Sequence, residues 1–394
     1  MNILLYPLDY PSEISDAADN ASFALENAVT LLEVQSRDTA IRQALNRRVS
    51  GQTDSSLQNR LCRARPVLMP LTRIGSRQVP APVFLGTIAY LGGGRSHGGA
   101  IIKAITSFSL TNDTIAPTGF RLSDGRTYMG TVGNQSSAMF CGGVNLQGLS
   151  GTVDELSYRQ VSIRRVGSGL TIPIFCGAGM GNKSIGVLLG GIDAAGVSLR
   201  HGERVTYGNE PTFSSLGNIL ATSRAAPHNG TSTPTTGFVY GGGSGLFFSL
   251  PILFSIESFN FSTLTTAPVG SNLVKRHIVH AAVGGSTKGY LLGGSDNPPA
   301  SPFGAEISAF TYSGQTLALL GITLPDAKVC SDGIGSSGAG YGVGGDTATS
   351  QWQGSTSIDK LTYDTEAISR IGATLPDPTA DQGGIGDYGA GFST

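Results

Sequence analysis

The stretch Gly289-Tyr290-Leu291-Leu292-Gly293-Gly294 decides the fold of this chain. Apolar residues run into a pair of glycines there, and the same unit recurs along most of the sequence. The other copies are Ala89–Gly93, Met139–Gly143, Val187–Gly191, Val239–Gly242 and Tyr341–Gly345, with a degenerate copy at Tyr388–Gly391. The first glycines of the six full copies are 50, 48, 51, 52 and 51 residues apart. A fixed period near ~50 residues predicts a repeat protein.

Each repeat reads as a small antiparallel sheet. The apolar run before the glycines is typical of a buried strand. The Gly-Gly pair suits a strand end with positive φ, or a place where a neighbouring sheet approaches closely. A loop follows each pair, and then a strand with period-2 alternation. These alternating strands are Ile105–Leu110, Val153–Tyr158, Arg204–Tyr207, Ile256–Phe261, Ile307–Tyr312 and Ile358–Tyr363. Four short strands per repeat predict one propeller blade.

With its phased Gly-Gly pairs and an aromatic third strand of the form Phe310-Thr311-Tyr312, the sequence resembles the kelch family over residues 81–394. The resemblance implies a mainly β, kelch-like propeller. Kelch repeats usually carry a tryptophan in the fourth strand, whereas the single tryptophan of this chain, Trp352, falls at a loop position. The propeller is therefore divergent, and no partner is carried over from the family.

The way in which the ring closes sets the number of blades. A ring of strands must close, because open sheet edges invite unwanted pairing. We expect Gly384–Gly391 to form the inner half of a seventh blade, with the outer half supplied from within residues 28–80. A six-bladed ring is the alternative, in which the last strands pair with the first blade.

Residues 1–80 differ from the repeats, and we expect an N-terminal docking and connector segment there. About residues 12–50 contain no Gly or Pro and carry helical spacing, for example Ala21, Leu25, Ala28 and Leu32. The alternative is that part of this segment is a strand that completes a blade. Arg60, Arg63 and Arg65 follow in the connector. We expect them to pair with carboxylates of the same assembly. Binding to nucleic-acid phosphates and a plain solvated face are the alternatives.

Charge and composition limit the classes of function. Charged residues make up 13% of the 394 residues, about half the usual share. The net charge of −1 argues against bulk nucleic-acid binding. The N-terminus lacks the basic and apolar regions of a signal peptide, and no apolar window is long enough to span a membrane. The four cysteines are widely spaced, and we expect buried free thiols.

No motif singles out an enzyme, a cofactor or a metal. His277 and His280 are the closest pair of histidines, but residues three apart on a strand point to opposite faces. Glycine-rich stretches such as Gly177–Gly181 lack a following helix, so phosphate binding is not expected. We therefore predict no catalytic, cofactor-binding or metal-binding residue.

The loop after the fourth Gly-Gly pair differs from its counterparts. It carries Leu246, Phe247, Phe248 and Leu250 where other repeats carry polar residues. Exposed apolar patches of this kind are typical of binding surfaces. We predict an interface there, with Trp352 on an equivalent loop as a second contact. The alternative is an extended third strand packed within the ring.

These observations favour a non-enzymatic structural or adhesion protein of a virus particle, such as a phage tail-fibre or baseplate component. We expect it in the virion tail, made in the host cytoplasm without a signal peptide. Expected partners are other tail proteins through the N-terminal segment, further copies of the chain, and a host-surface glycan or protein. No nucleic acid and no membrane insertion are expected. The alternatives are a cellular kelch-like interaction scaffold and a carbohydrate-active propeller enzyme.

Overall fold

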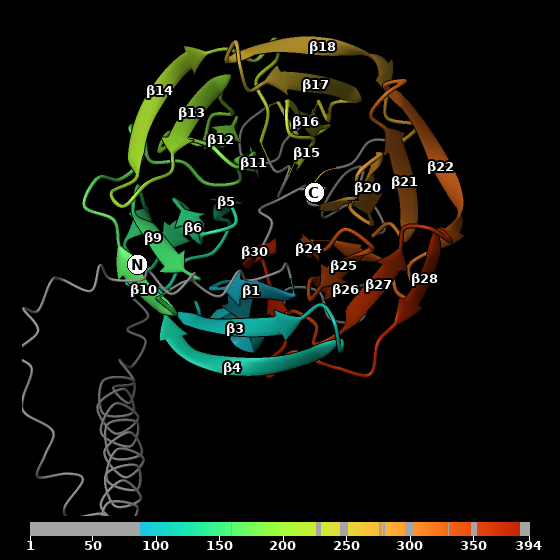
Figure 1. Cartoon of the computed structure of the whole chain (residues 1–394), viewed down its shortest axis with the longest axis horizontal. Helices are drawn as coiled ribbons and strands as arrows, with labels where there is room; N and C mark the ends of the chain where they lie inside the picture. The colour runs from blue at the N-terminus through green and yellow to red at the C-terminus, as the bar shows by residue number, and fades with distance from the viewer. Residues whose placement is uncertain are drawn as a thin grey trace, which may run out of the picture. The chain divides into compact units, whose positions relative to one another are not determined.

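The computed structural model describes residues 87–158, 160–225, 230–244, 251–275, 278, 280–295, 303–329, 331–347 and 353–386. The described part of the chain is mainly β and contains six four-stranded antiparallel sheets. Figure 1 shows these sheets as six blades around a common axis, which confirms the predicted propeller. Among the described residues, no helix is long and apolar enough to cross a membrane.

Each blade has four strands, ordered from the axis outward. Blade 1 contains β30 (Gly383–Gly386), β1 (Ile88–Gly92), β3 (Ala104–Ser109) and β4 (Thr114–Arg121). Blade 2 contains β5 (Gly130–Gly133), β6 (Ser137–Cys141), β9 (Val153–Ser157) and β10 (Ser162–Arg165). Blade 3 contains β11 (Ala178–Gly181), β12 (Ile185–Leu189), β13 (His201–Thr206) and β14 (Thr212–Asn218).

The second half of the ring repeats this order. Blade 4 contains β15 (Thr231–Ser232), β16 (Thr236–Tyr240), β17 (Ser255–Asn260) and β18 (Thr265–Asn272). Blade 5 contains β19 (Ala281–Gly284), β20 (Lys288–Leu292), β21 (Glu306–Thr311) and β22 (Thr316–Thr323). Blade 6 contains β24 (Asp332–Gly335), β25 (Ala339–Val343), β27 (Ile358–Thr362) and β28 (Ala367–Arg370).

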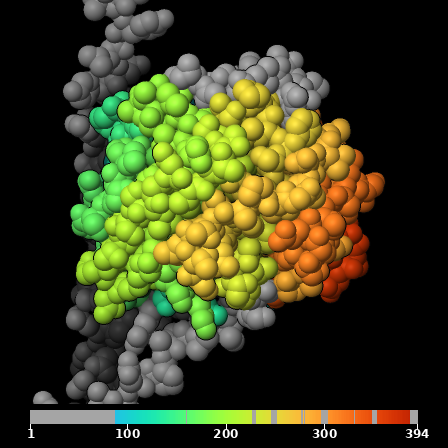
Figure 2. Space-filling model, turned by 90° about the horizontal axis from the view of Figure 1, so that it is seen from above, coloured from blue at the N-terminus to red at the C-terminus, as the bar shows by residue number. Residues whose placement is uncertain are grey.

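Short two-stranded ribbons lie in the loops between the blade strands. They are β2 (Arg95–Ser96) with β29 (Thr379–Ala380), β7 (Val144–Asn145) with β8 (Gly148–Leu149), and β23 (Lys328–Val329) with β26 (Asp346–Thr347). A single turn of 3-10 helix, η1 (His97–Gly99), follows β2. Figure 2 shows the outer wall of the ring, where residues of blades 3 to 5 form adjacent bands from green to orange.

The prediction of seven blades was wrong, and the six-bladed alternative is the one observed. The C-terminal strand β30 pairs with β1, so it supplies the innermost strand of blade 1 rather than half of a further blade. The chain is therefore a ring whose first blade is completed by its last strand. The predicted helical segment at residues 12–50 and the strands proposed within 28–80 lie outside the described residues.

The Gly-Gly pairs lie where two blades meet. Both glycines of every pair have positive φ, as in Gly93 at 65° and Gly94 at 97°. A Cβ on Gly93 would lie 2.5 Å from the carbonyl oxygen of Arg126 in the segment that enters blade 2. The N–H of Gly94 donates to that same carbonyl at 2.8 Å. Both predicted reasons for the glycines, positive φ and close approach, are confirmed. In the first repeat the equivalent pair is Gly93–Gly94 rather than Gly92–Gly93.

A second set of small residues lets neighbouring blades interlock. A side chain of an innermost strand points into the next blade, where a glycine leaves room for it. A Cβ on Gly186 would lie 2.7 Å from Cβ of Val132, and one on Gly289 would lie 2.6 Å from Oγ1 of Thr231. Branched side chains facing glycines in this way allow the close packing that protein interiors require.

The aromatic residue after the third strand packs against the preceding blade. Tyr363 of blade 6 stacks on Tyr290 of blade 5 with ring centroids 5.2 Å apart, and Tyr312 of blade 5 stacks on Phe238 of blade 4 at 5.4 Å. Such ring pairs stabilise by about 0.5–1.5 kcal/mol beyond the area that they bury. The aromatic position noted in the sequence is therefore an interface between blades.

Candidate functional site

A polar cleft lies between blades 2 and 3. It has a volume of about 890 Å³. Its walls are the turns between the two inner strands of each blade, the outer hairpin of blade 2 and the outer turn of blade 3. The lining residues are Asn134, Ser136, Ser137, Glu155, Ser157, Gln160, Ser162, Arg164, Lys183, Ser184, Tyr207, Gly208, Asn209 and Glu210.

Asparagine side chains shape the inner wall of the cleft. Oδ1 of Asn134 accepts hydrogen bonds from the backbone N–H groups of Ser136 and Ser137, at 2.8 and 3.1 Å. This fixes a tight turn, because asparagine can replace a backbone acceptor there. Nδ2 of Asn134 donates to the carbonyl oxygen of Lys183 at 3.3 Å and thereby links the two blades. The turn residues are therefore held in place before any ligand arrives.

Arg164 joins the two sides of the cleft. Its Nε donates to Oε2 of Glu155 at 2.9 Å within blade 2, and its Nη1 donates to Oε1 of Glu210 in blade 3 at 2.8 Å. Nη2 also donates to the carbonyl oxygen of Asn209. The hydrogen bonds to Glu210 and Glu155 raise the pKa of Arg164 above its ordinary value. The guanidinium is therefore a fixed charge on the cleft wall.

The two carboxylates differ in access to solvent. The side chain of Glu155 is 9% exposed and that of Glu210 is 77% exposed, with Arg164 at 42%. Tyr207 also lines the cleft, but its hydroxyl donates to the carbonyl oxygen of Gly133 at 2.7 Å. The cleft thus presents a fixed guanidinium donor and fixed carboxylate acceptors beside serine hydroxyls. Such a surface can bind a ligand that is rich in hydroxyl groups.

The site residues predicted from the sequence are not tested by this structure. Leu246, Phe247, Phe248, Leu250, Trp352, Arg60, Arg63 and Arg65 all lie outside the described residues. Arg95, at the start of the loop in the first repeat, is described and forms ion pairs with Asp346 and Asp381.

Sequence reasoning missed the cleft because its residues come from separate repeats. Glu155 and Arg164 are direct partners in the hairpin of β9 and β10, so the hairpin register could have paired them. Glu210 lies 46 positions from Arg164 and is brought close only by the ring. No sequence motif within a single repeat predicts that Glu210 and Arg164 lie close together.

Among the described residues, no group of three or more His, Cys, Asp or Glu side chains could hold a metal ion. Fold and cleft together define a six-bladed β-propeller with a polar cleft between two blades. No protein-family model matches the sequence, and a search of curated proteins returns no match.

Proposed function

We propose that this protein is a non-enzymatic recognition module of a virus particle, a kelch-like propeller in a phage tail fibre or baseplate. In this proposal the cleft between blades 2 and 3 binds a hydroxyl-rich ligand, a glycan of the host surface. The observation that carries the proposal is the polar lining of the cleft, with Arg164 fixed between Glu155 and Glu210.

The chemistry of the lining supports a saccharide as the ligand. Drug-like ligands favour pockets that are mainly apolar, whereas this lining is mostly hydroxyl, amide, carboxylate and guanidinium groups. Sugar hydroxyls both donate and accept, and the cleft supplies partners for both. Charge-assisted hydrogen bonds, donated by Arg164 to a sugar oxygen and accepted by Glu155 from a sugar hydroxyl, would be the strongest contacts.

The rigidity of the cleft walls supports binding without large rearrangement. Glu155 and Arg164 belong to paired strands, and the turn at Asn134 is fixed by its own side chain. Sites built on regular elements hold their geometry better than sites on loops. The low content of charged residues, 13%, fits an external module and supports the assignment to a virion.

Binding is tested by screening the full chain against an array of bacterial-surface glycans, followed by calorimetry on each hit. Arg164→Gln is expected to raise the Kd about tenfold or more, since a hydrogen bond from a charged group is worth ~1.5–3 kcal/mol. Arg370→Gln is the matched control, because Arg370 in blade 6 also bridges two carboxylates, Asp359 of the same blade and Asp326 of the segment that follows blade 5. Equal affinities of the two variants would overturn the role of the cleft.

Particle association is tested separately. Antibodies against the chain should label virus particles released from the producing host, and particles without label would exclude the virion assignment. A soluble cellular partner recovered in place of particles would favour the interaction scaffold. Release of reducing ends from a bound glycan would favour the carbohydrate-active enzyme, for which Glu155 and Glu210 supply two carboxylates.

A further inference from the structure

Blade 2 contains a fully buried arginine. Nη1 of Arg126 donates to the carbonyl oxygens of Gly142 and Thr152, at 2.7 and 2.6 Å, and Nη2 pairs with Asp154 in the third strand. Nη2 also lies 3.4 Å from the carbonyl oxygen of Phe140. Burial lowers the pKa of Arg126, and Asp154 opposes this effect. Four acceptors therefore form a cradle for one cation.

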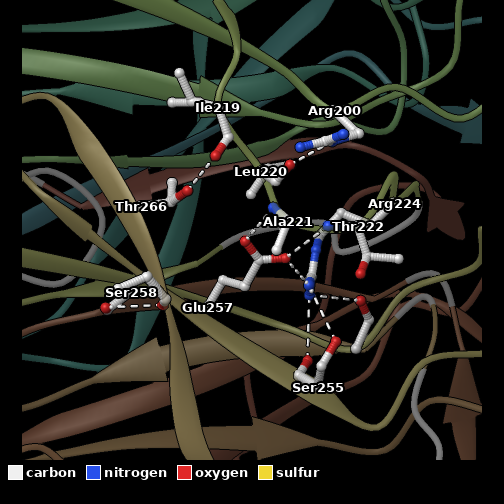
Figure 3. Close-up of polar contacts among 12 residues, drawn as sticks. Arg200, Ile219, Leu220, Ala221, Thr222, Arg224, Ser255, Glu257, Ser258 and Thr266 are labelled. Carbon is white, nitrogen blue, oxygen red and sulfur yellow. Dashed lines mark hydrogen bonds and ion pairs between the residues drawn. The ribbon is translucent and has the colours of Figure 1, made fainter.

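A buried cation paired with a carboxylate of the third strand recurs in blades 4 and 6. Figure 3 shows Arg224 directed at Glu257 and Ser255, and Nη2 of Arg224 lies 2.5 Å from Oε1 of Glu257. Nη1 of Arg224 donates to the carbonyl oxygen of Gly241 at 3.0 Å. In blade 6 Nζ of Lys328 lies 2.6 Å from Oδ2 of Asp359. In blades 2, 4 and 6 this position therefore holds a cation, whereas in blade 3 it is Ile174, whose carbonyl accepts from Gly143 as that of Arg126 accepts from Gly94.

In blade 1 threonines stand at both the position of the buried cation and the position of its carboxylate partner. Arg126 precedes Thr127, which bridges to Val144 after the glycine pair. In blade 1 Thr379 precedes Ala380, which pairs with Arg95 after the glycine pair. Thr379 therefore corresponds to Arg126. In β3, Thr106 comes directly after the strand partner of Gly92, just as Asp154 comes directly after the strand partner of Cys141.

A cavity of about 270 Å³ lies where the blade-1 cation would be. Its lining includes the counterparts of every group that Arg126 contacts: Leu91 for Phe140, Gly93 for Gly142, Ala104 for Thr152 and Thr106 for Asp154. The backbone frame is the same, since Gly93 N–H donates to Ala104 O at 3.2 Å as Gly142 N–H donates to Thr152 O at 2.9 Å. The carbonyl acceptors of the cradle are present, and at the position of Arg126 blade 1 has Thr379 instead of a cation.

The rest of the lining makes the cavity suitable for a small ligand. Asp377 and Arg121 both line the cavity, so a carboxylate that favours a cation is accompanied by a positive charge that works against it. Phe120 and Pro376 supply apolar surface beside them. Carbonyl oxygens accept hydrogen bonds and cannot donate them. The ligand group that fits them must therefore carry several hydrogen-bond donors.

We propose that the blade-1 cavity binds the guanidinium group of a small ligand, which takes the place that the side chain of Arg126 occupies in blade 2. The planar group would donate to the carbonyl oxygens of Gly93 and Ala104. Guanidinium groups are delocalised and weakly hydrated, so they suit a partly buried cradle better than ammonium does. This site is separate from the cleft and does not depend on the glycan proposal.

The test uses methylguanidinium as the probe and methylurea as its neutral analogue. Saturation-transfer NMR on the full chain should detect methylguanidinium contact and only weak methylurea contact. The Thr106→Asp variant restores the missing carboxylate and should tighten methylguanidinium binding about tenfold, as expected for a hydrogen bond to a charged group. Ser107→Asp is the control, because it adds the same charge on the opposite face of β3.

A second variant separates binding from folding. Thr106→Asp combined with Thr379→Arg rebuilds the blade-2 pair, so it should abolish methylguanidinium binding and raise the Tm above that of Thr106→Asp alone. Equal saturation by the two probes in the native chain overturns the proposal. So does a Thr106→Asp variant that binds no tighter than Ser107→Asp, or a double variant that keeps the native affinity.

Discussion

Arg95 and Asp381 lie 286 positions apart in the sequence, and Nη2 of Arg95 donates to Oδ2 of Asp381 at 2.8 Å. The same Nη2 donates to Oδ2 of Asp346 at 2.8 Å. Both carboxylates are buried, and together they raise the pKa of Arg95 against the effect of its own burial. These contacts join blade 6 and the end of the chain to blade 1, next to the pairing of β30 with β1. They stabilise the closed ring at the place where its last blade meets its first.

Breaking this contact should destabilise the whole propeller. We expect Asp381→Asn to lower the free energy of unfolding by about 1.5–3 kcal/mol, since Arg95 keeps Asp346 as a partner but loses its charge-assisted hydrogen bonds to Asp381. Urea unfolding followed by circular dichroism measures the loss. Asp326→Asn breaks an exposed contact with Arg370 and should cost about 1 kcal/mol or less. Similar losses in both variants would contradict the role of Arg95 in closure.

Two glycines with nearly equal φ allow the cost of backbone strain to be measured apart from the cost of a steric clash with a neighbouring blade. Gly93 has φ of 65° and Gly217 has φ of 72°. Alanine at either position carries a backbone cost of roughly 1–2 kcal/mol. Only Gly93 has a neighbour at 2.5 Å, the carbonyl oxygen of Arg126, while Gly217 has open space. Gly93→Ala should therefore cost about 1–3 kcal/mol more than Gly217→Ala. Unfolding midpoints in urea that coincide would refute the close approach of blades 1 and 2.

Glu203 should make stability depend on acid pH. Burial alone raises its pKa, but hydrogen bonds from His201 and Thr171 outweigh this, and the pKa lies below its ordinary value of 4.5. A carboxyl whose pKa is lowered by folding stabilises the protein above the unfolded pKa, and this stability is lost as the pH falls through the folded pKa. Between about pH 6 and about pH 3 the native chain should lose more stability than Glu203→Gln.

Equilibrium unfolding at each pH measures this difference. Glu210→Gln is the control, because Glu210 is exposed in the next turn of the same blade. Its stability curve should run parallel to that of the native chain. A Glu203→Gln curve that also runs parallel would show that the hydrogen bonds from His201 and Thr171 add nothing.

The two described cysteines should resist alkylation in the folded protein. Cys141 is 1% exposed, and burial raises the pKa of its thiol to about 12. Cys176 is also buried, with its pKa raised by the same cause. The thiolate is the reactive form, so iodoacetamide at about pH 8 should modify both residues only after unfolding. Peptide mass spectrometry gives the result, and rapid modification of Cys141 in the native chain would disprove its burial.

The repeats could be recognised from the sequence because their signals are local. Gly293 and Gly294 need positive φ and close approach in every copy, so no other residue type fits. The period-2 pattern of Ile307–Tyr312 also needs only its own neighbours, and β21 lies there. The number of blades could not be read in this way. The innermost strand of blade 1 lies at Gly383–Gly386, and in the sequence it looks like the beginning of a further repeat.

In the candidate site, too, one contact follows from local sequence and another depends on the packing of the blades. Glu155 and Arg164 face each other in one hairpin, and their pairing follows from the register. Glu210 meets Arg164 because blade 3 packs beside blade 2, and no sequence spacing predicts that. The cavity in blade 1 exists only because β1, β3 and β4 pack beside residues from the end of the chain. Nothing in the sequence around Thr379 and Thr106 marks them as the counterparts of Arg126 and Asp154.

The sequence by itself determined that this protein is a β repeat with a period near ~50 residues, because alternating apolar residues and paired glycines act over a few neighbouring positions. Only the tertiary structure decided that there are six blades, that the last strand completes the first blade, and where clefts and cavities lie. Those features depend on contacts between residues hundreds of positions apart, such as Arg95 with Asp381, and the geometry of ring closure brings such residues together.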